Sequence, residues 1–138
     1  MVLRIALAQC RQTADREQNA AAIFQNLEQA AVAGAQIVCF PEAQTVGYRV
    51  DIATPDTPVP VAYLADLHGR VADRCGELGI ACILGTETPL ESDSRRGRPY
   101  NSALIVSERG EILGVHRKAR LTPLDAIAYS PGSTFETY

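Results

Sequence analysis

A strand, a helix and a second strand are predicted near the N-terminus, and this order limits the chain to a small group of folds. Residues 2–9 (VLRIALAQ) and 36–40 (QIVCF) are short apolar runs bounded by polar residues, a pattern typical of largely buried strands. The residues between them have helical periodicity, and Thr13 or Asp15 can cap the start of that helix. Pro41 ends the second strand, because proline cannot donate a hydrogen bond to a neighbouring strand. The three elements form a βαβ unit, so we expect the two strands to be parallel.

The next part of the chain repeats helix and strand once and then changes character. Residues 61–78 return to helical periodicity, and residues 80–85 (IACILG) are predicted to form a third buried strand. Residues 102–107 and 111–117 are two strands joined by a turn that contains Gly110, which is a hairpin signal. We therefore predict an α/β fold in which a sheet of parallel strands ends in an antiparallel hairpin.

Three segments are predicted to lack regular structure. Residues 51–60 carry three prolines, and residues 88–99 form a polar run. Residues 119–138 are expected to be irregular until a strand-like alternation begins at Phe135. In open α/β sheets such connections lie at the surface, and those that follow the strand ends border the ligand site.

The composition argues against several kinds of partner. The chain has 138 residues, near the usual size of one domain, and it is 46% hydrophobic and 21% charged, as globular proteins are. A net charge of -3 offers no basic surface to nucleic acid, and no apolar run approaches the roughly 20 residues of a spanning helix. The apolar segment from Val2 to Ala8 is too short and too polar for a signal-peptide core. We therefore expect a cytoplasmic protein with no nucleic-acid or membrane partner.

The cysteines and His68 are predicted to be structural. The sequence has no C-x-x-C pair, so we expect no zinc site and no other metal ion. His68 is expected to be a partly buried or surface histidine of the helix at 61–78. Each cysteine is best explained as a small buried hydrophobic residue within a strand or on a helix. The four are Cys10, Cys39, Cys75 and Cys82.

Two charged residues follow directly after predicted strands. Glu42 comes after Pro41 at the end of the second strand, and Lys118 comes after the last strand. A carboxylate held at a strand end can act as a general acid or base, and a lysine nearby can stabilise an anionic intermediate. Glutamate and lysine at strand ends are also common surface residues, so both interpretations are open on spacing alone.

Four segments of the chain form a specific pattern, and they are VLRIALAQC, AGAQIVCFPEAQTVGYRV, YNSALIVSERGEILGVHRK and YSPGSTF. In this order and at these intervals they resemble the nitrilase superfamily of carbon-nitrogen hydrolases. The strongest anchors are FPE followed by GY, and YNSALIV leading through a glycine turn to HRK. The resemblance runs from residue 2 to residue 138. It implies a four-layer α-β-β-α sandwich, of which residues 1–138 would form the N-terminal half.

The resemblance implies a role for several residues. Glu42 matches the glutamate that acts as general base toward a cysteine thiol and later toward water, and Lys118 matches the lysine that stabilises the tetrahedral intermediate. Tyr48 would be a wall of the substrate pocket or a packing residue. Asp125 is the only acid where family members often carry a glutamate that contacts the lysine, and its role is open. The family's nucleophile is a cysteine that lies beyond the lysine in a context that this sequence does not contain.

The resemblance predicts hydrolysis of a non-peptide carbon–nitrogen bond of an amide, a carbamoyl compound or a nitrile. No cofactor is required, the substrate is a small molecule, and we expect a homo-oligomer. Without the cysteine, residues 1–138 should be inactive alone. One alternative is a catalytically inactive half-domain that serves as a binding or assembly module. A second, a nucleotide-binding module, is disfavoured because no glycine-rich loop joins a strand to a helix.

Overall fold

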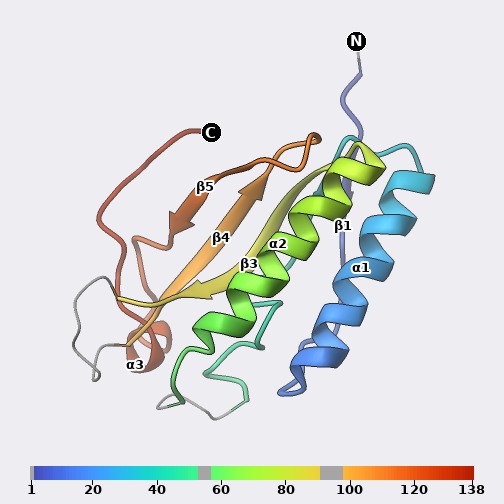
Figure 1. Ribbon diagram of the computed structural model, residues 1–138. Helices are drawn as coiled ribbons and strands as arrows, with labels where there is room; N and C mark the ends of the chain where they lie inside the picture. Colours follow the sequence, from blue (N-terminus) through green and yellow to red (C-terminus); the bar gives the residue numbers. More distant parts are fainter. Residues whose placement is uncertain (1, 53–56, 91–97) are drawn as a thin grey trace.

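A five-stranded sheet with two long helices along one face forms the body of the molecule (Figure 1). The computed structural model describes residues 2–52, 57–90 and 98–138. The strand order is β1-β2-β3-β4-β5, with parallel pairing from β1 to β3 and antiparallel pairing from β3 to β5. The elements are β1 (Ile5–Leu7), α1 (Arg16–Val32), β2 (Ile37–Cys39), α2 (Val61–Leu78), β3 (Ala81–Thr88), β4 (Tyr100–Val106), β5 (Ile112–Arg117) and α3 (Asp125–Ala128). The predicted α/β fold with parallel strands and a closing hairpin is confirmed.

Local capping groups explain where the two long helices begin and end. The side chain of Asp15 accepts hydrogen bonds from the backbone amides of Glu17 and Gln18, so Asp15 rather than Thr13 caps α1. After α2, Gly79 adopts a left-handed conformation with φ of 64° and its amide donates to the carbonyl of Cys75. Glycine adopts this conformation without steric cost, so the helix ends where the sequence predicted.

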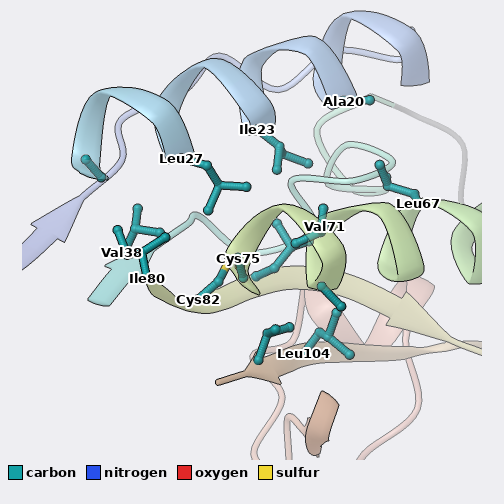
Figure 2. Close-up of a cluster of buried hydrophobic side chains, with 14 of the residues drawn as sticks. Ala20, Ile23, Leu27, Val38, Leu67, Val71, Cys75, Ile80, Cys82 and Leu104 are labelled. Atoms are coloured by element: carbon teal, nitrogen blue, oxygen red, sulfur yellow. The ribbon is translucent and has the colours of Figure 1, made fainter. Parts of the chain in front are cut away.

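The core lies between the helices and one face of the sheet (Figure 2). Side chains from α1 and α2 pack against alternate residues of β2, β3 and β4. The side chains in this contact are almost completely buried. The central members are Ile23, Leu27, Val38, Leu67, Val71, Cys75, Ile80, Cys82, Leu84 and Leu104. This packing holds the carboxyl ends of β2 and β3 at fixed positions, and the site described below is built on them.

The opposite face of the sheet carries apolar side chains that no helix of the described residues covers. Successive residues of a strand point to opposite faces, and the strand register places Leu7, Cys39, Ile83 and Ile105 in one row across the sheet. Leu7 is 77% exposed and Ile83 is 38% exposed. The prediction of a largely buried strand at 2–9 is therefore wrong in extent and in burial. We call this surface the bare face.

Two other expectations need correction. The segment after Phe135 forms no strand among the described residues, and a four-residue helix, α3, stands in a region predicted to be irregular. Cys75 and Cys82 are buried as predicted, but Cys10 and Cys39 are only half-buried. Cys39 lies in the row of the bare face, and Cys10 follows the end of β1. The predicted loops at 51–60 and 88–99 lie partly outside the described residues.

Two features are absent from the described residues. No helix in that part of the chain is long and apolar enough to cross a membrane. Nor does any group of three or more histidine, cysteine, aspartate or glutamate side chains there have an arrangement that could hold a metal ion.

Candidate active site

Glu42 and Lys118, the two charged residues singled out by sequence, form an ion pair. The Lys118 Nζ atom lies 2.9 Å from Oε2 and 3.1 Å from Oε1 of Glu42. Glu42 follows β2 and Lys118 follows β5 directly, so two strands that are not neighbours in the sheet bring them together. The Lys118 backbone amide donates to the carbonyl of Asn101, which keeps the lysine in register with β4.

The turn that carries Glu42 packs directly on the backbone of β3. Ala43 has a positive φ of 50°, and it is the one non-glycine residue in the described chain with this strained conformation. A Cβ atom on Gly85 would lie 1.9 Å from the carbonyl oxygen of Pro41 and 2.8 Å from the amide nitrogen of Ala43. Only glycine at position 85 allows the turn around Glu42 to pack this closely on β3. Sequence reasoning did not identify Gly85.

We expect Gly85→Ala to destabilise the protein by about 3 kcal/mol or more, because backbone atoms cannot rotate away from the new methyl group. The change should also move Glu42 away from Lys118. Gly69→Ala is the matched control, since Gly69 lies within α2 with no atom within 4 Å of an added Cβ. That control should stabilise the fold by about 0.5–1 kcal/mol. Thermal or denaturant unfolding of both variants checks the prediction, and equal stability of the two would contradict it.

Polar side chains hold the same turn from both sides. Asn101 Nδ2 donates to Glu42 Oε2 over 2.7 Å, and the Gln12 side-chain amide donates to the Glu42 carbonyl. Thr45 Oγ1 lies 3.0 Å from Thr86 Oγ1 on β3. Sequence reasoning missed Asn101 as a site residue, although it lies within the YNSALIV motif. The available signal was an amide side chain in a largely apolar strand, and the structure shows that this side chain is buried.

His68 supports the turn indirectly. Its Nε2 atom lies 2.9 Å from the same Thr86 hydroxyl, and burial lowers the pKa of its imidazole. The prediction of a partly buried helix histidine is confirmed.

Asp125 is a second carboxylate in contact with the lysine. Its Oδ2 atom lies 3.1 Å from Lys118 Nζ and accepts hydrogen bonds from the amide and hydroxyl of Thr122. Its Oδ1 atom accepts a hydrogen bond from the Tyr48 hydroxyl. The Asp125 side chain is fully buried. The lysine therefore lies between two carboxylates, and a contact that sequence reasoning left open is present.

These contacts fix the charge of each group. Burial alone would raise the pKa of Asp125, but hydrogen bonds from Tyr48, Thr122 and Lys118 outweigh it and lower the pKa to about 2. Burial alone would lower the pKa of Lys118, but the carboxylates of Glu42 and Asp125 outweigh it and raise that pKa. The pKa of Tyr48 is raised, first by burial and then by its hydrogen bond to Asp125. At neutral pH the site thus contains an ammonium, a buried carboxylate and a neutral phenol.

These residues line an open pocket of about 280 Å³. Its described walls are Gln12, Glu42, Tyr48, Lys118, Thr122 and Asp125. Tyr48 also stacks on Tyr129 with ring centroids 5.8 Å apart, so both interpretations of Tyr48, pocket wall and packing residue, describe the same side chain. The Glu42 side chain is 57% exposed and so remains accessible to a ligand.

An α/β sheet with Glu42 after β2 and Lys118 after β5, together with Asp125 at the start of α3, thus brings two carboxylates and a lysine into one pocket. Residues 4–138 match the model of the carbon-nitrogen hydrolase family, and the chain belongs to this family. The prediction of the superfamily from sequence is confirmed.

Known proteins with similar sequence or structure belong to the same group. The chain is 29% identical over 127 residues to a nitrilase of Pseudomonas syringae pv. syringae (strain B728a), covering 80% of this chain and 36% of the nitrilase. An amidase of Nesterenkonia sp. AN1, solved as a cysteine-to-alanine mutant with butyramide, superposes with a TM-score of 0.79 at 25% identity. That match covers 96% of this chain and 49% of the amidase. The chain thus spans about half or less of the length of these relatives.

Proposed function

We propose that this chain provides the general base and the intermediate-stabilising lysine of an enzyme that hydrolyses a non-peptide carbon–nitrogen bond. The observation that carries the proposal is the bridging position of Lys118 between Glu42 and Asp125 in an open pocket. Membership of the carbon-nitrogen hydrolase family supports it. The substrate class is a small amide, carbamoyl compound or nitrile, and the butyramide bound by the Nesterenkonia amidase favours an amide.

We further propose that residues 1–138 form the N-terminal half of the hydrolase domain. The nucleophile is then a cysteine from residues outside this chain. Two observations support this division: the chain spans 49% of the similar amidase, and the described pocket walls include no cysteine. The bare face is the surface on which a second sheet of the same domain would pack.

The proposed reaction starts with proton transfer from the cysteine thiol to the Glu42 carboxylate. The thiolate then forms a bond to the substrate carbonyl carbon, and the electron pair of the C=O bond moves to oxygen, beside the Lys118 ammonium. When the carbon–nitrogen bond breaks, protonated Glu42 returns its proton to the leaving nitrogen, releasing ammonia or an amine and leaving a thioester. Glu42 next deprotonates water, which attacks the thioester carbon, and the carbon–sulfur bond breaks as the thiol regains its proton.

Asp125 serves this reaction by holding the lysine. The aspartate already accepts hydrogen bonds from Thr122 and Tyr48 and is fully buried, so it has little capacity left to bind substrate. We infer that it keeps Lys118 charged and oriented, the part that a longer glutamate plays in related sequences. A shorter side chain suffices here because α3 brings the aspartate to 3.1 Å from the ammonium.

Lys118→Ala in the protein that carries both this chain and the cysteine is expected to lower kcat about a hundredfold or more and to change KM much less. The lysine acts on a charge that develops only in the intermediate, so its loss affects the chemical step. Ammonia release from butyramide measures both constants, and Arg120→Ala, at an exposed position two residues after Lys118, is the control. A variant altered only in KM would reassign Lys118 to substrate binding.

A catalytically inactive half-domain is the second candidate function. The pocket walls without a cysteine and the exposed apolar face favour it, since both suit a binding or assembly module. The codons that follow Tyr138 in the gene distinguish the two candidates. A cysteine downstream supports the enzyme, whereas a stop codon supports the binding module.

A further inference from the structure

A buried ion pair lies next to the turn that carries Glu42. Arg49 donates from Nε to Glu87 Oε1 over 2.6 Å and from the guanidinium to Glu87 Oε2 over 2.8 Å. The two side chains are 4% and 0% exposed. Removing two charges from water costs so much that such a pair often stabilises a fold no better than apolar residues of the same size. Stability alone therefore gives a weak reason for placing a charged pair at this position.

Other contacts of the pair indicate what it organises. The Arg49 backbone amide donates to the hydroxyl of Tyr129 over 3.1 Å, and that hydroxyl also forms a hydrogen bond with the Glu87 side chain. The Arg49 guanidinium donates to the carbonyl of Thr57. Arg49, Glu87 and Tyr129, here called the buried cluster, thus join β3 to the segment after Glu42 and to the segment after α3.

The buried cluster connects to the lysine through one continuous series of contacts. The Tyr129 ring stacks on Tyr48, and the Tyr48 hydroxyl donates to Asp125, which holds Lys118. Each contact joins a different segment of the chain, so the position of each group depends on the one before it. Tyr48 follows β2, whereas Asp125 begins α3, and the buried cluster is anchored to both of these segments.

The strand register gives a second connection from the cluster to the site. Glu87 on β3 pairs with Asn101 on β4, and Asn101 donates to the Glu42 carboxylate. Glu87 is therefore the strand partner of the residue that contacts the proposed base, and it also contacts Tyr129 of the tyrosine pair. The Glu87 carboxylate fixes the positions of its neighbours more closely than an apolar side chain would, because each of its two oxygens requires a hydrogen-bond donor in a defined direction.

We propose that Arg49, Glu87 and Tyr129 are positioning residues that hold Tyr48 and Asp125 and, through them, set the environment of Lys118. This proposal rests on the proposed function only where it gives Lys118 a catalytic role. The alternative is that the cluster stabilises the fold without affecting the lysine.

Lys118 is the only lysine of the chain, so amine acylation followed by peptide mass analysis reports on this side chain. The N-terminal amine in the same sample provides the reference rate. Only the uncharged amine reacts, and the contact with Asp125 raises the pKa of Lys118, so acylation of wild-type Lys118 should be slow at pH 8. Loss of that contact lowers the pKa, moves the pH profile of acylation to lower pH and accelerates the reaction at pH 8.

We expect Tyr129→Phe and Glu87→Gln to accelerate acylation of Lys118 at pH 8 by about threefold or more relative to the N-terminal amine, with a lower midpoint of the pH profile. Asp125→Asn should accelerate acylation the most, since it removes the negative charge in contact with Lys118. Val71→Ala is the control for a general loss of stability: it leaves a cavity in the core and should not move the midpoint.

Each outcome decides the proposal. An unchanged midpoint in Tyr129→Phe and Glu87→Gln, with a shifted one in Asp125→Asn, means that the cluster is only structural. An unchanged midpoint in Asp125→Asn breaks the last contact of the series and also overturns the proposal. If Glu87→Gln does not fold because Arg49 loses its carboxylate partner, Tyr129→Phe decides, since it keeps the stacked ring and the ion pair. The assay needs no turnover, so its result is independent of whether the hydrolase function holds.

Discussion

Replacing Glu42 with glutamine is expected to lower kcat by about a hundredfold or more in the protein that carries the nucleophile cysteine. The amide has nearly the shape of the carboxylate, but it cannot take the thiol proton, return it to the leaving nitrogen or deprotonate water. All three proton transfers of the proposed reaction fail together. The fold should survive, because the Glu42 side chain is more than half exposed.

Ammonia release from a short aliphatic amide measures the effect, and thermal unfolding of the same preparation shows whether the fold is intact. Glu77→Gln is a suitable control, since Glu77 is an exposed glutamate of α2 whose partner, Arg74, lies on the helix surface. That variant should keep parental turnover. Near-parental kcat in a folded Glu42→Gln protein would show that the base has been assigned to the wrong residue.

Much of the fold could be predicted from sequence, because its signals are local. Asp15 lies at the start of a periodic segment, and Gly79 ends another, so helix limits follow from a few neighbouring residues. Parallel pairing of the first strands follows from the intervening helix. By contrast, α3 is four residues long, too short for any periodicity to indicate, and the exposure of Leu7 depends on a layer of structure that the strand pattern does not encode.

The site divides in the same way. Glu42 and Lys118 were found because each directly follows a strand and lies in a recognisable motif. Gly85 and Asn101 were missed because their roles depend on contacts with a turn about 40 or more positions away in the chain. The contact of Asp125 with Lys118 spans only seven residues, yet it needs α3 and Tyr48 to orient the carboxylate. Sequence therefore indicated which two charged residues meet in the pocket, whereas the supporting contacts required coordinates.

The 138-residue chain by itself is expected to self-associate through the bare face, consistent with the homo-oligomer proposed from sequence. At roughly 25 cal/mol per Å² of apolar surface, leaving a few hundred Å² in water forgoes several kcal/mol. That amount is comparable to the whole stability of a small domain, about 5–15 kcal/mol. Soluble monomers rarely expose an apolar surface of this kind, so covering it with a second copy should be favourable.

Sedimentation velocity at micromolar concentration should therefore show a dimer or larger species. Leu7→Lys places a charge at the β1 end of the exposed row and should shift the chain toward monomer. Val32→Lys is the matched control, because Val32 is 91% exposed but lies on α1, which covers the opposite side of the sheet. It should leave the association unchanged. A wild-type chain that sediments as a monomer, unfolds cooperatively and binds no hydrophobic dye would mean that the bare face tolerates water and needs no partner sheet.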